Sequence, residues 1–262
     1  MPELPDLKVY AENIGKLILG KKVSDVSVFS PKSIDCGADT LSDAIKGDIV
    51  SEIYAEGKEL FIKFGNGNEI AIHLMLNGKC YYIDAAEAET QASKIMGLYF
   101  ADGKCLMVTD FQSFCKISLN SPQNDVPDVL SYGFTKAYFM RMADQYKRKK
   151  IKSFLLDQKI MRGIGNAYAD EILWKAKISP KSITGKIPQT NLELLFFSIK
   201  GVMLWAISQI KQIDPDIING EERKFMRVHN PRLKFTKDRE RIHKEVIGSK
   251  KTYYTDSQVH YY

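Results

Sequence analysis

Cysteine is scarce in this chain, and its spacing excludes two classes of structural site. The 262 residues contain four cysteines, none of them in a Cys-x-x-Cys pair and none after Cys115. A disulfide framework needs regularly spaced cysteines, and a structural zinc site needs clustered thiols or histidines. We therefore expect reduced thiols, as in a cytosolic protein, and no bound metal.

Long apolar runs and targeting signals are also lacking. Acidic residues at Glu3, Asp6 and Glu12 interrupt the N-terminal segment, which excludes a signal peptide. The most apolar stretch, residues 194–207, contains Lys200 and is too short to span a bilayer. The composition, 44% hydrophobic and 27% charged, is ordinary for a globular protein, so we expect no membrane partner.

Positive charge is concentrated in two places. The net charge is +6, and residues 221–262 carry 11 Lys or Arg against 6 Asp or Glu. A second basic cluster, KRKKIK, spans residues 147–152. Clustered positive charge is typical of proteins that bind a polyanion, most often a nucleic acid. A solvated helix face or a solubilising tail would have the same composition, and charge alone does not decide between these interpretations.

The N-terminus, MPELPDLKVY, places a proline and a carboxylate directly after the initiator methionine. Removal of Met1 would leave the secondary amine of Pro2 as the mature terminus, with Glu3 beside it. A free α-amine titrates near pH ~8, so part of it is unprotonated and nucleophilic at neutral pH. Such an amine forms a Schiff base with a carbonyl carbon, which is covalent catalysis. The simpler alternative is that Pro2 is the first residue of a helix, where its missing N–H is harmless.

Hydrophobic periodicity divides the chain into a strand-rich part and a helical part. After a helix over residues 5–19, alternating segments separated by Gly, Asn or Asp turns predict an antiparallel β-sandwich, so that residues 1–120 form one domain. Residues 121–134 are polar and contain proline, which is typical of a linker. Helical periodicity predicts a helical domain over residues 135–222, and residues 223–262 are expected to form a hairpin. The predicted fold class is therefore α+β.

The segment LLDQKIMRGIGNAYADEILWKAKISP, residues 155–180, is the most specific part of the sequence. A helix is expected to end near Gln158, a turn follows with Gly163 and Gly165, and Asn166 is expected to cap the next helix. A helix that starts after glycines can present its backbone amides to a phosphate, although a tight helix–helix connection has the same pattern. The whole segment resembles the helix–two-turn–helix motif of the formamidopyrimidine-DNA glycosylase/endonuclease VIII family. Chains of that family also begin with a Pro-Glu pair.

The resemblance covers nearly the whole chain and implies a bifunctional DNA glycosylase with AP-lyase activity on oxidised bases in duplex DNA. In the family, the terminal proline attacks C1′, displaces the base and forms an imine, and β/δ-elimination then cuts the strand. These roles fall on Pro2 as the nucleophile and on Glu3 for ring opening and proton transfer. Asp6 stands where the family has a second glutamate, and Lys58, in AEGKELFIKF, matches a catalytic lysine on a β-hairpin. The chemistry implies no metal and no organic cofactor.

The same resemblance implies a set of DNA-binding residues. Asn166 in GIGN, Lys152 in the basic cluster and Lys250 near the C-terminus are assigned to this role. Leu76 in HLMLNG and Phe114 in DFQSFCK match side chains that fill the space left by a flipped-out nucleotide. The expected partner is damaged double-stranded DNA, bound by a monomer in a bacterial-type cytoplasm, at the nucleoid.

The C-terminal module departs from the family pattern. The family has a zinc-stapled hairpin with two Cys-x-x-Cys pairs and an arginine on the loop between its strands. Alignment puts Thr255 and Gln258 at one pair of ligand positions and Phe235 and Asp238 at the other, and Lys250 takes the place of the arginine. The resemblance therefore implies a zincless finger held by packing. The packing residues would include Tyr253 and Tyr254.

Two alternatives to the enzyme stay open. The first alternative is a lesion-binding protein of the same fold that does not catalyse the reaction. Asp6 and the missing zinc ligands favour it. Ser113 also favours it, because it replaces an arginine that reads the orphan base. Pro2, Glu3 and Lys58 oppose that alternative. The second alternative is that the chain shares only the helix–two-turn–helix, which also occurs in a ribosomal protein and a topoisomerase. The match at the N-terminus opposes this alternative. The preferred lesion and the opposite-base preference are left open.

Overall fold

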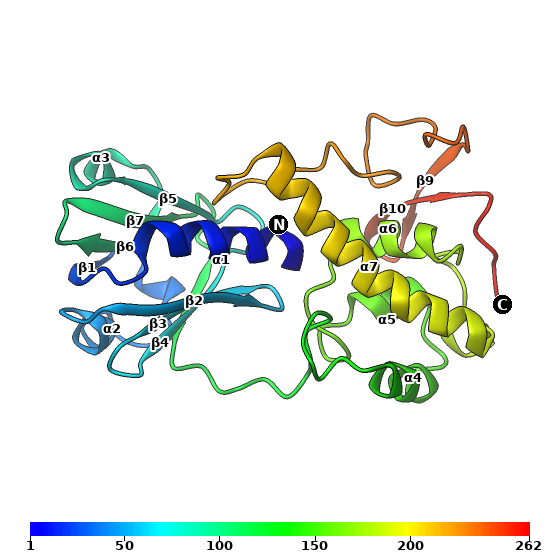
Figure 1. The fold of residues 1–262 in the computed structure, drawn as a ribbon, viewed down its shortest axis with the longest axis horizontal. Helices are drawn as coiled ribbons and strands as arrows, with labels where there is room; N and C mark the ends of the chain where they lie inside the picture. The colour runs from blue at the N-terminus through cyan, green and yellow to red at the C-terminus, as the bar shows by residue number, and fades with distance from the viewer. The chain divides into compact units, whose positions relative to one another are not determined.

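Alternating apolar residues in the N-terminal part of the chain form two antiparallel sheets. In the computed structural model, which describes residues 1–262, one sheet has the strand order β1-β6-β7-β5 and the other β2-β3-β4-β8 (Figure 1). The predicted β-sandwich is confirmed. The strands are β1 (Val23–Val28), β2 (Val50–Glu56), β3 (Glu59–Phe64), β4 (Glu69–His73), β5 (Lys79–Asp84), β6 (Lys94–Phe100), β7 (Lys104–Thr109) and β8 (Lys116–Leu119).

Two glycine turns set the register of these sheets. Gly67 joins β3 to β4 with a φ of 89°, and Gly103 joins β6 to β7 with a φ of 78°. Glycine adopts this left-handed conformation readily because it has no Cβ. The compositions NGN and ADG predict both turns, and the structure confirms them.

Helix α1, Leu4–Ile18, confirms the predicted N-terminal helix to within one residue at either end. It packs against β2 and β3. The Tyr10 hydroxyl donates a hydrogen bond to the Gly220 carbonyl, and Asn13 Nδ2 donates to the Ile217 carbonyl at 3.0 Å. These bonds attach residues 210–221 to the helix. The shorter helices α2 (Ala38–Ile45) and α3 (Ala85–Thr90) are not expected from the sequence.

The second half of the chain is mainly helical, as its periodicity predicts. The α-helices are α4 (Lys136–Gln145), α5 (Ile151–Leu156), α6 (Asn166–Lys175) and α7 (Gln189–Ile213), and the two strands are β9 (Ile242–Ile247) and β10 (Lys250–Thr255). Single 3₁₀ turns are η1 (Pro31–Ser33) and η2 (Thr184–Lys186). The strands β9 and β10 form the expected antiparallel hairpin.

The chain divides into two compact units. Unit 1 is Met1–Gln123 with Ile210–Glu221, and unit 2 is Asn124–Gln209 with Glu222–Tyr262. This division differs from the sequence-based one, because residues 210–221 belong with α1 and because the hairpin packs on α6 within unit 2. A separate finger domain therefore remains only a prediction.

Helix α7 supplies much of the core of unit 2. Leu195, Ile199 and Met203 are fully buried on one side of it, and Phe196 packs against the rings of Phe134 and Phe139. The helix has 25 residues, and its length and composition would suffice to cross a membrane, a test that core helices of soluble proteins also pass. Its buried side accounts for part of its apolar composition, while Leu194, Phe197 and Leu204 on the same helix are exposed.

Candidate functional site

The start of α1 holds two buried carboxylates in a reciprocal arrangement. Glu3 is the N-cap residue and is 4% exposed, and Asp6 is fully buried. Asp6 Oδ2 accepts a hydrogen bond from the Glu3 backbone N–H at 2.8 Å, and the Glu3 side chain accepts one from the Asp6 backbone N–H. This capping box satisfies two helix amides and fixes the backbone at Glu3. Asp6 thus fixes the position of Glu3.

Pro2 lies outside the helix that follows it. It is buried, and α1 begins two residues later with Pro5 in its first turn. The alternative interpretation of Pro2 as the first helical residue is therefore wrong. The Met1 ammonium forms an ion pair with the Glu221 carboxylate, and Pro2 nitrogen is an amide nitrogen while Met1 is attached. Nucleophilic chemistry at Pro2 requires removal of Met1, because only then does Pro2 carry a free secondary amine.

Lys58 lies in the tight turn between β2 and β3, directly after Gly57, whose φ is 61°. Its charge acts on His73, the last residue of β4. Burial, and second the positive charge of Lys58, lower the pKa of His73. His73 Nδ1 also accepts a hydrogen bond from the Met75 backbone N–H at 3.1 Å. The imidazole is therefore neutral at neutral pH. Sequence reasoning missed His73, although it opens the HLMLNG segment singled out for Leu76.

Leu76 and Phe114 are exposed on two adjoining loops of unit 1. Their side chains are 62% and 50% exposed, which is unusual for large apolar residues. The loop of Leu76 ends at Lys79, the first residue of β5, and the loop of Phe114 starts after Thr109 of β7, which pairs with Lys79. A hydrogen bond from Asn77 to Gln112 joins the two loops. The structure thus brings both predicted wedge residues to one edge of the sheet.

Both exposed side chains follow a residue with strained backbone. Met75 and Ser113 have φ values of 53° and 54°, in the left-handed region that non-glycine residues rarely adopt. Asp110, which is 1% exposed, holds the second loop by accepting hydrogen bonds from the backbone N–H groups of Phe114 and Cys115, both at 2.8 Å. Strain of this kind persists where the surroundings fix it, as at ligand-binding sites.

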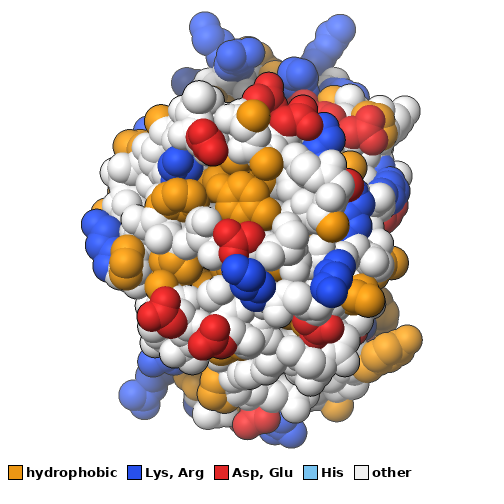
Figure 2. Space-filling model, turned by 90° about the vertical axis from the view of Figure 1, so that its left-hand side faces the viewer, with side chains coloured by type: hydrophobic (Ala, Val, Ile, Leu, Met, Phe, Trp, Pro, Cys, Tyr) orange, Lys and Arg blue, Asp and Glu red, His pale blue; other side chains and the backbone are white.

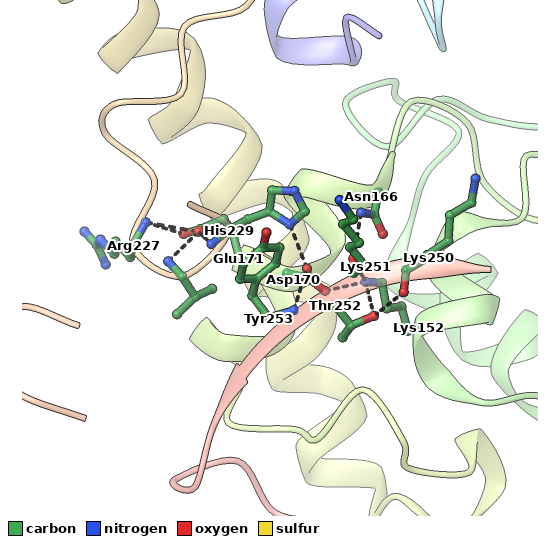
Figure 3. A network of polar contacts seen from close by, with 11 residues as sticks. Lys152, Asn166, Asp170, Glu171, Arg227, His229, Lys250, Lys251, Thr252 and Tyr253 are labelled. Carbon is green, nitrogen blue, oxygen red and sulfur yellow. Dashed lines mark hydrogen bonds and ion pairs between the residues drawn. The ribbon is translucent and has the colours of Figure 1, made fainter. Parts of the chain in front are cut away.

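In unit 2, Lys152 is buried instead of exposed (Figure 3). Its ammonium is 2.6 Å from Asp170 Oδ1 and donates a hydrogen bond to Thr252 Oγ1 at 2.8 Å. Asp170 Oδ2 in turn contacts His229 Nδ1 at 2.7 Å and accepts from the Tyr253 backbone N–H at 3.0 Å. Lys152 therefore joins α5, α6 and β10. Because its side chain is 2% exposed and bonded within the protein, this arrangement does not support the predicted contact with DNA, which stays a prediction.

Asn166 is the first residue of α6, and Gly165 is the N-cap. The expectation that Asn166 caps the helix is therefore wrong. Its Nδ2 donates a hydrogen bond to the Lys251 carbonyl at 2.9 Å, and its Oδ1 is buried without a hydrogen-bond partner. Asn166 thus ties the start of α6 to β10, the strand that begins with Lys250. The Lys250 side chain is exposed and extends away from the network (Figure 3).

Glu171, adjacent to Asp170, anchors a second segment to α6. Its carboxylate accepts hydrogen bonds from the backbone N–H groups of Arg227, Val228 and His229, at 3.0, 2.8 and 2.8 Å respectively. Burial raises the pKa of Glu171, although these bonds act in the opposite direction. Neither carboxylate is recognisable from the sequence, because ADEIL has the composition of an ordinary helix.

The positions aligned with the zinc ligands of the family do not fit a metal. Phe235 has no ligand atom, and the polar atoms of Thr255 and Gln258 bond to protein. Gln258 Oε1 accepts from the Thr255 backbone N–H at 2.8 Å, and its Nε2 donates to the Ile178 carbonyl at 2.8 Å. Tyr253 packs in a cluster with Trp174, as expected for a finger held by packing. Hydrogen bonds thus stabilise the hairpin together with the packing of Tyr253.

We expect purified protein to contain no stoichiometric zinc, because the chain has no thiol after Cys115. Elemental analysis measures the metal content, and a chelator should leave DNA binding unchanged. Gln258→Ala should destabilise the protein by about 1–3 kcal/mol, because it leaves buried backbone groups without partners. One tightly bound zinc per chain would contradict this prediction.

Surface charge is mixed on the face of the molecule in Figure 2. Acidic and basic side chains are interspersed there around a patch of apolar side chains (Figure 2). Several of the charges in unit 1 are paired, for example Lys46 with Asp25 at 2.6 Å. A surface that binds DNA needs a continuous positive potential, so this face does not have the charge expected of a DNA-binding surface.

Comparison with known proteins gives consistent matches along the chain. Residues 1–117 match the formamidopyrimidine-DNA glycosylase N-terminal domain, and residues 126–214 match the formamidopyrimidine-DNA glycosylase H2TH domain. The chain is 30% identical over 216 residues to the formamidopyrimidine-DNA glycosylase of Lactococcus lactis subsp. cremoris, covering 79% of this chain and 78% of that protein. The Enterococcus faecalis enzyme is 30% identical over 218 residues, covering 79% and 76%.

Solved structures match the fold over almost its whole length. The Lactococcus lactis Fpg in complex with DNA containing an abasic site superimposes with a TM-score of 0.85 at 23% identity, covering 97% of this chain and 98% of that one. MutM in complex with DNA containing carbocyclic 8-oxo-G gives a TM-score of 0.85 at 24% identity, covering 98% and 100%. At this identity the match concerns the fold.

Proposed function

Because the chain belongs to the formamidopyrimidine-DNA glycosylase family, we propose that it is a bifunctional DNA glycosylase and AP lyase that excises oxidised bases from duplex DNA. The observation that carries this proposal is the arrangement at the N-terminus, where Pro2 precedes a helix whose capping box fixes Glu3. A secondary amine beside a carboxylate supplies both the nucleophile and the proton carrier that the reaction needs.

The proposed reaction uses groups of this chain alone. The Pro2 nitrogen attacks C1′ of the damaged nucleotide, and the bond from C1′ to the base breaks. The base leaves with the electron pair and takes up the proton that the Pro2 nitrogen releases. Glu3 donates a proton to O4′ as the sugar ring opens and an iminium forms between Pro2 and C1′. The Glu3 carboxylate, now deprotonated, takes a proton from C2′, and the electrons of that C–H bond expel the 3′ phosphate. Hydrolysis of the iminium releases Pro2.

The remaining residues are proposed to position the substrate. Asp6 acts as a positioning residue through the capping box, and Lys58 pairs with a phosphate that flanks the lesion. A neutral His73 beside Lys58 adds no positive charge that would oppose the lysine. Leu76 and Phe114 are proposed to enter the space left by the flipped nucleotide, since both are exposed on one edge.

Unit 2 is proposed to bind the DNA backbone. Asn166 places the first backbone N–H groups of α6, and Lys250 adds a charge at the hairpin loop. Lysine binds phosphate as a point charge, without the bidentate geometry of arginine. We further propose that the protein acts as a monomer on damaged DNA in the bacterial cytoplasm, at the nucleoid.

Strand cleavage tests the proposed activity. Protein with a free Pro2 should nick an end-labelled duplex that contains 8-oxoguanine or an oxidised pyrimidine, and gel electrophoresis of the products measures the rate. Glu3→Gln should abolish base excision and retain binding, whereas Glu12→Gln, an exposed carboxylate on the same helix, should leave the rate unchanged. Tight binding of each damaged duplex without any nick would favour the lesion-binding alternative.

Lys250→Ala should weaken binding to all DNA sequences equally, because phosphate contacts position the protein without reading bases. The slope of log affinity against log salt should fall by about 0.9 for each phosphate that the variant no longer neutralises. Fluorescence anisotropy with two unrelated duplexes over a range of salt concentrations measures both quantities. Lys46→Ala, whose side chain already pairs with Asp25, serves as the control. An unchanged affinity and slope for Lys250→Ala would show that the hairpin charge is only solvated surface.

A further inference from the structure

Unit 2 contains a cavity that the proposed reaction does not use. Its volume is about 400 Å³, and it is formed by α6, α7 and the segment around Arg227. Trp174, Trp205 and Phe197 supply aromatic walls. The polar and charged groups of the lining are Arg227, Lys175, Ser198 and Glu171. Ligand sites in proteins are typically cavities of about 300–1,000 Å³ with mainly apolar walls and a few polar groups. This cavity has those properties.

Arg227 is held at the cavity by aromatic rings, with no carboxylate as its partner. Its guanidinium lies 4.5 Å from the centre of the Trp205 ring and 5.6 Å from that of Trp174. No protein atom accepts a hydrogen bond from it. The carboxylate of Glu171, which also lines the cavity, instead accepts hydrogen bonds from three backbone N–H groups. A rigid guanidinium with free donors is suited to bind an anionic group.

Gly201 leaves room in this cavity at a position where packing does not require glycine. It lies in the interior of α7, where glycine is less favourable than alanine by about 1 kcal/mol. A Cβ built on Gly201 meets no atom within 4 Å, and the residue lines the cavity. The missing side chain thus leaves space at the wall of the cavity that a larger residue would fill.

The exposed apolar residues of α7 lie at the same place. Phe197 is 60% exposed and Leu194 is 57% exposed, and both line the cavity. Apolar side chains of a core helix are expected to be buried, and a cluster of exposed ones beside a cavity marks a binding surface.

We propose that this cavity binds a planar aromatic anion, with its ring against Phe197 and Gly201 and its anionic group on Arg227. The site is independent of the proposed glycosylase reaction. A nucleotide and an aromatic carboxylate share this chemistry, since each combines a flat ring with one negatively charged group.

The two tryptophans of the chain make the proposal easy to test, because both line the cavity. The probe is 8-anilinonaphthalene-1-sulfonate, an aromatic sulfonate that accepts energy from excited tryptophan. We expect saturable energy transfer with one dye bound per chain. N-phenyl-1-naphthylamine, which has the same rings without the sulfonate, is the neutral control probe.

Two variants separate the parts of the site. Gly201→Leu should weaken binding of both probes by at least about tenfold, because the side chain fills the cavity while leucine favours the helix. Gly15→Leu is the matched control, since Gly15 also lies inside a helix and a Cβ placed on it would meet no atom within 4 Å. Arg227→Gln should weaken binding of the sulfonate probe by about tenfold or more and leave binding of the neutral probe unchanged.

Competition distinguishes the two sources of the ligand. Displacement of the dye by adenosine 5′-monophosphate would identify a nucleotide site, and displacement by 1-naphthoate a site for aromatic carboxylates. Three results would each overturn the proposal. The first is that Gly201→Leu binds the dye as tightly as the wild type, and the second is that Arg227→Gln changes the affinity for both probes equally. The third is that neither competitor displaces the dye. Strand cleavage by Gly201→Leu should stay at the wild-type rate, so failure of this site and failure of the proposed glycosylase are distinguishable.

Discussion

Borohydride is expected to link the protein covalently to duplex DNA that contains an abasic site, provided that Met1 has been removed. The reagent reduces the iminium between Pro2 and C1′ to a stable amine. Denaturing gel electrophoresis detects the adduct, and mass spectrometry of a digest should locate it at the N-terminal proline. The effect is all-or-none, because an amide nitrogen at Pro2 cannot form the iminium.

Retention of Met1, or addition of an N-terminal tag, should therefore abolish trapping without abolishing DNA binding. Pro2→Gly keeps a primary amine and should trap weakly. Glu3→Gln should impair excision of a damaged base more than trapping at an abasic site, since the abasic site has already lost its base. Protein with a proven free Pro2 that binds abasic DNA tightly and never traps would rule out the lyase mechanism.

Asp170→Ala should lower the free energy of unfolding by about 3–5 kcal/mol, because it leaves the ammonium of Lys152 buried without its counter-ion. Asp170 is fully buried, and its carboxylate also bonds His229 and the Tyr253 backbone, so the substitution removes several interactions at once. Urea unfolding followed by circular dichroism measures the change.

A double-mutant comparison separates the charge from the packing. Lys152→Met with Asp170→Leu should recover much of the stability, because no unpaired charge is then buried. Asp25→Ala, which breaks the exposed pair with Lys46, should change stability by about 1 kcal/mol or less. A destabilisation of under about 1 kcal/mol in Asp170→Ala would show that Lys152 reaches water in solution.

Local sequence predicts most of the elements because their signals are local. The NGN and ADG turns contain the glycine that each turn requires, and Thr135 caps α4 by accepting a hydrogen bond from the Tyr138 backbone N–H. Glu3 is recognisable because it stands next to Pro2, and Asp6 because it stands where the family has a second glutamate. The capping box that joins them has a spacing of three residues, which a sequence can show.

The network in unit 2 is not predictable from the sequence because its members are distant in the chain. Lys152 has the pattern of a surface residue because it follows four basic residues and one isoleucine. Its partner Asp170 lies on another helix, and Thr252 comes from the C-terminal hairpin. His73 escapes prediction for a similar reason, since its neighbour Lys58 belongs to a different hairpin. Long-range pairing of polar groups leaves no periodic pattern.

The thiols of this chain are expected to react slowly with peroxide at neutral pH. Burial raises the pKa of Cys80 and Cys115 to about 12 and that of Cys105 to about 11. Burial also raises the pKa of Cys36. Peroxide attacks the thiolate, and at neutral pH these side chains remain protonated. The hairpin is held by Thr255, Gln258 and Tyr253, so it offers no sulfur ligand for an oxidant to destroy. Unit 2 contains no cysteine, so oxidation of a thiol cannot release its hairpin.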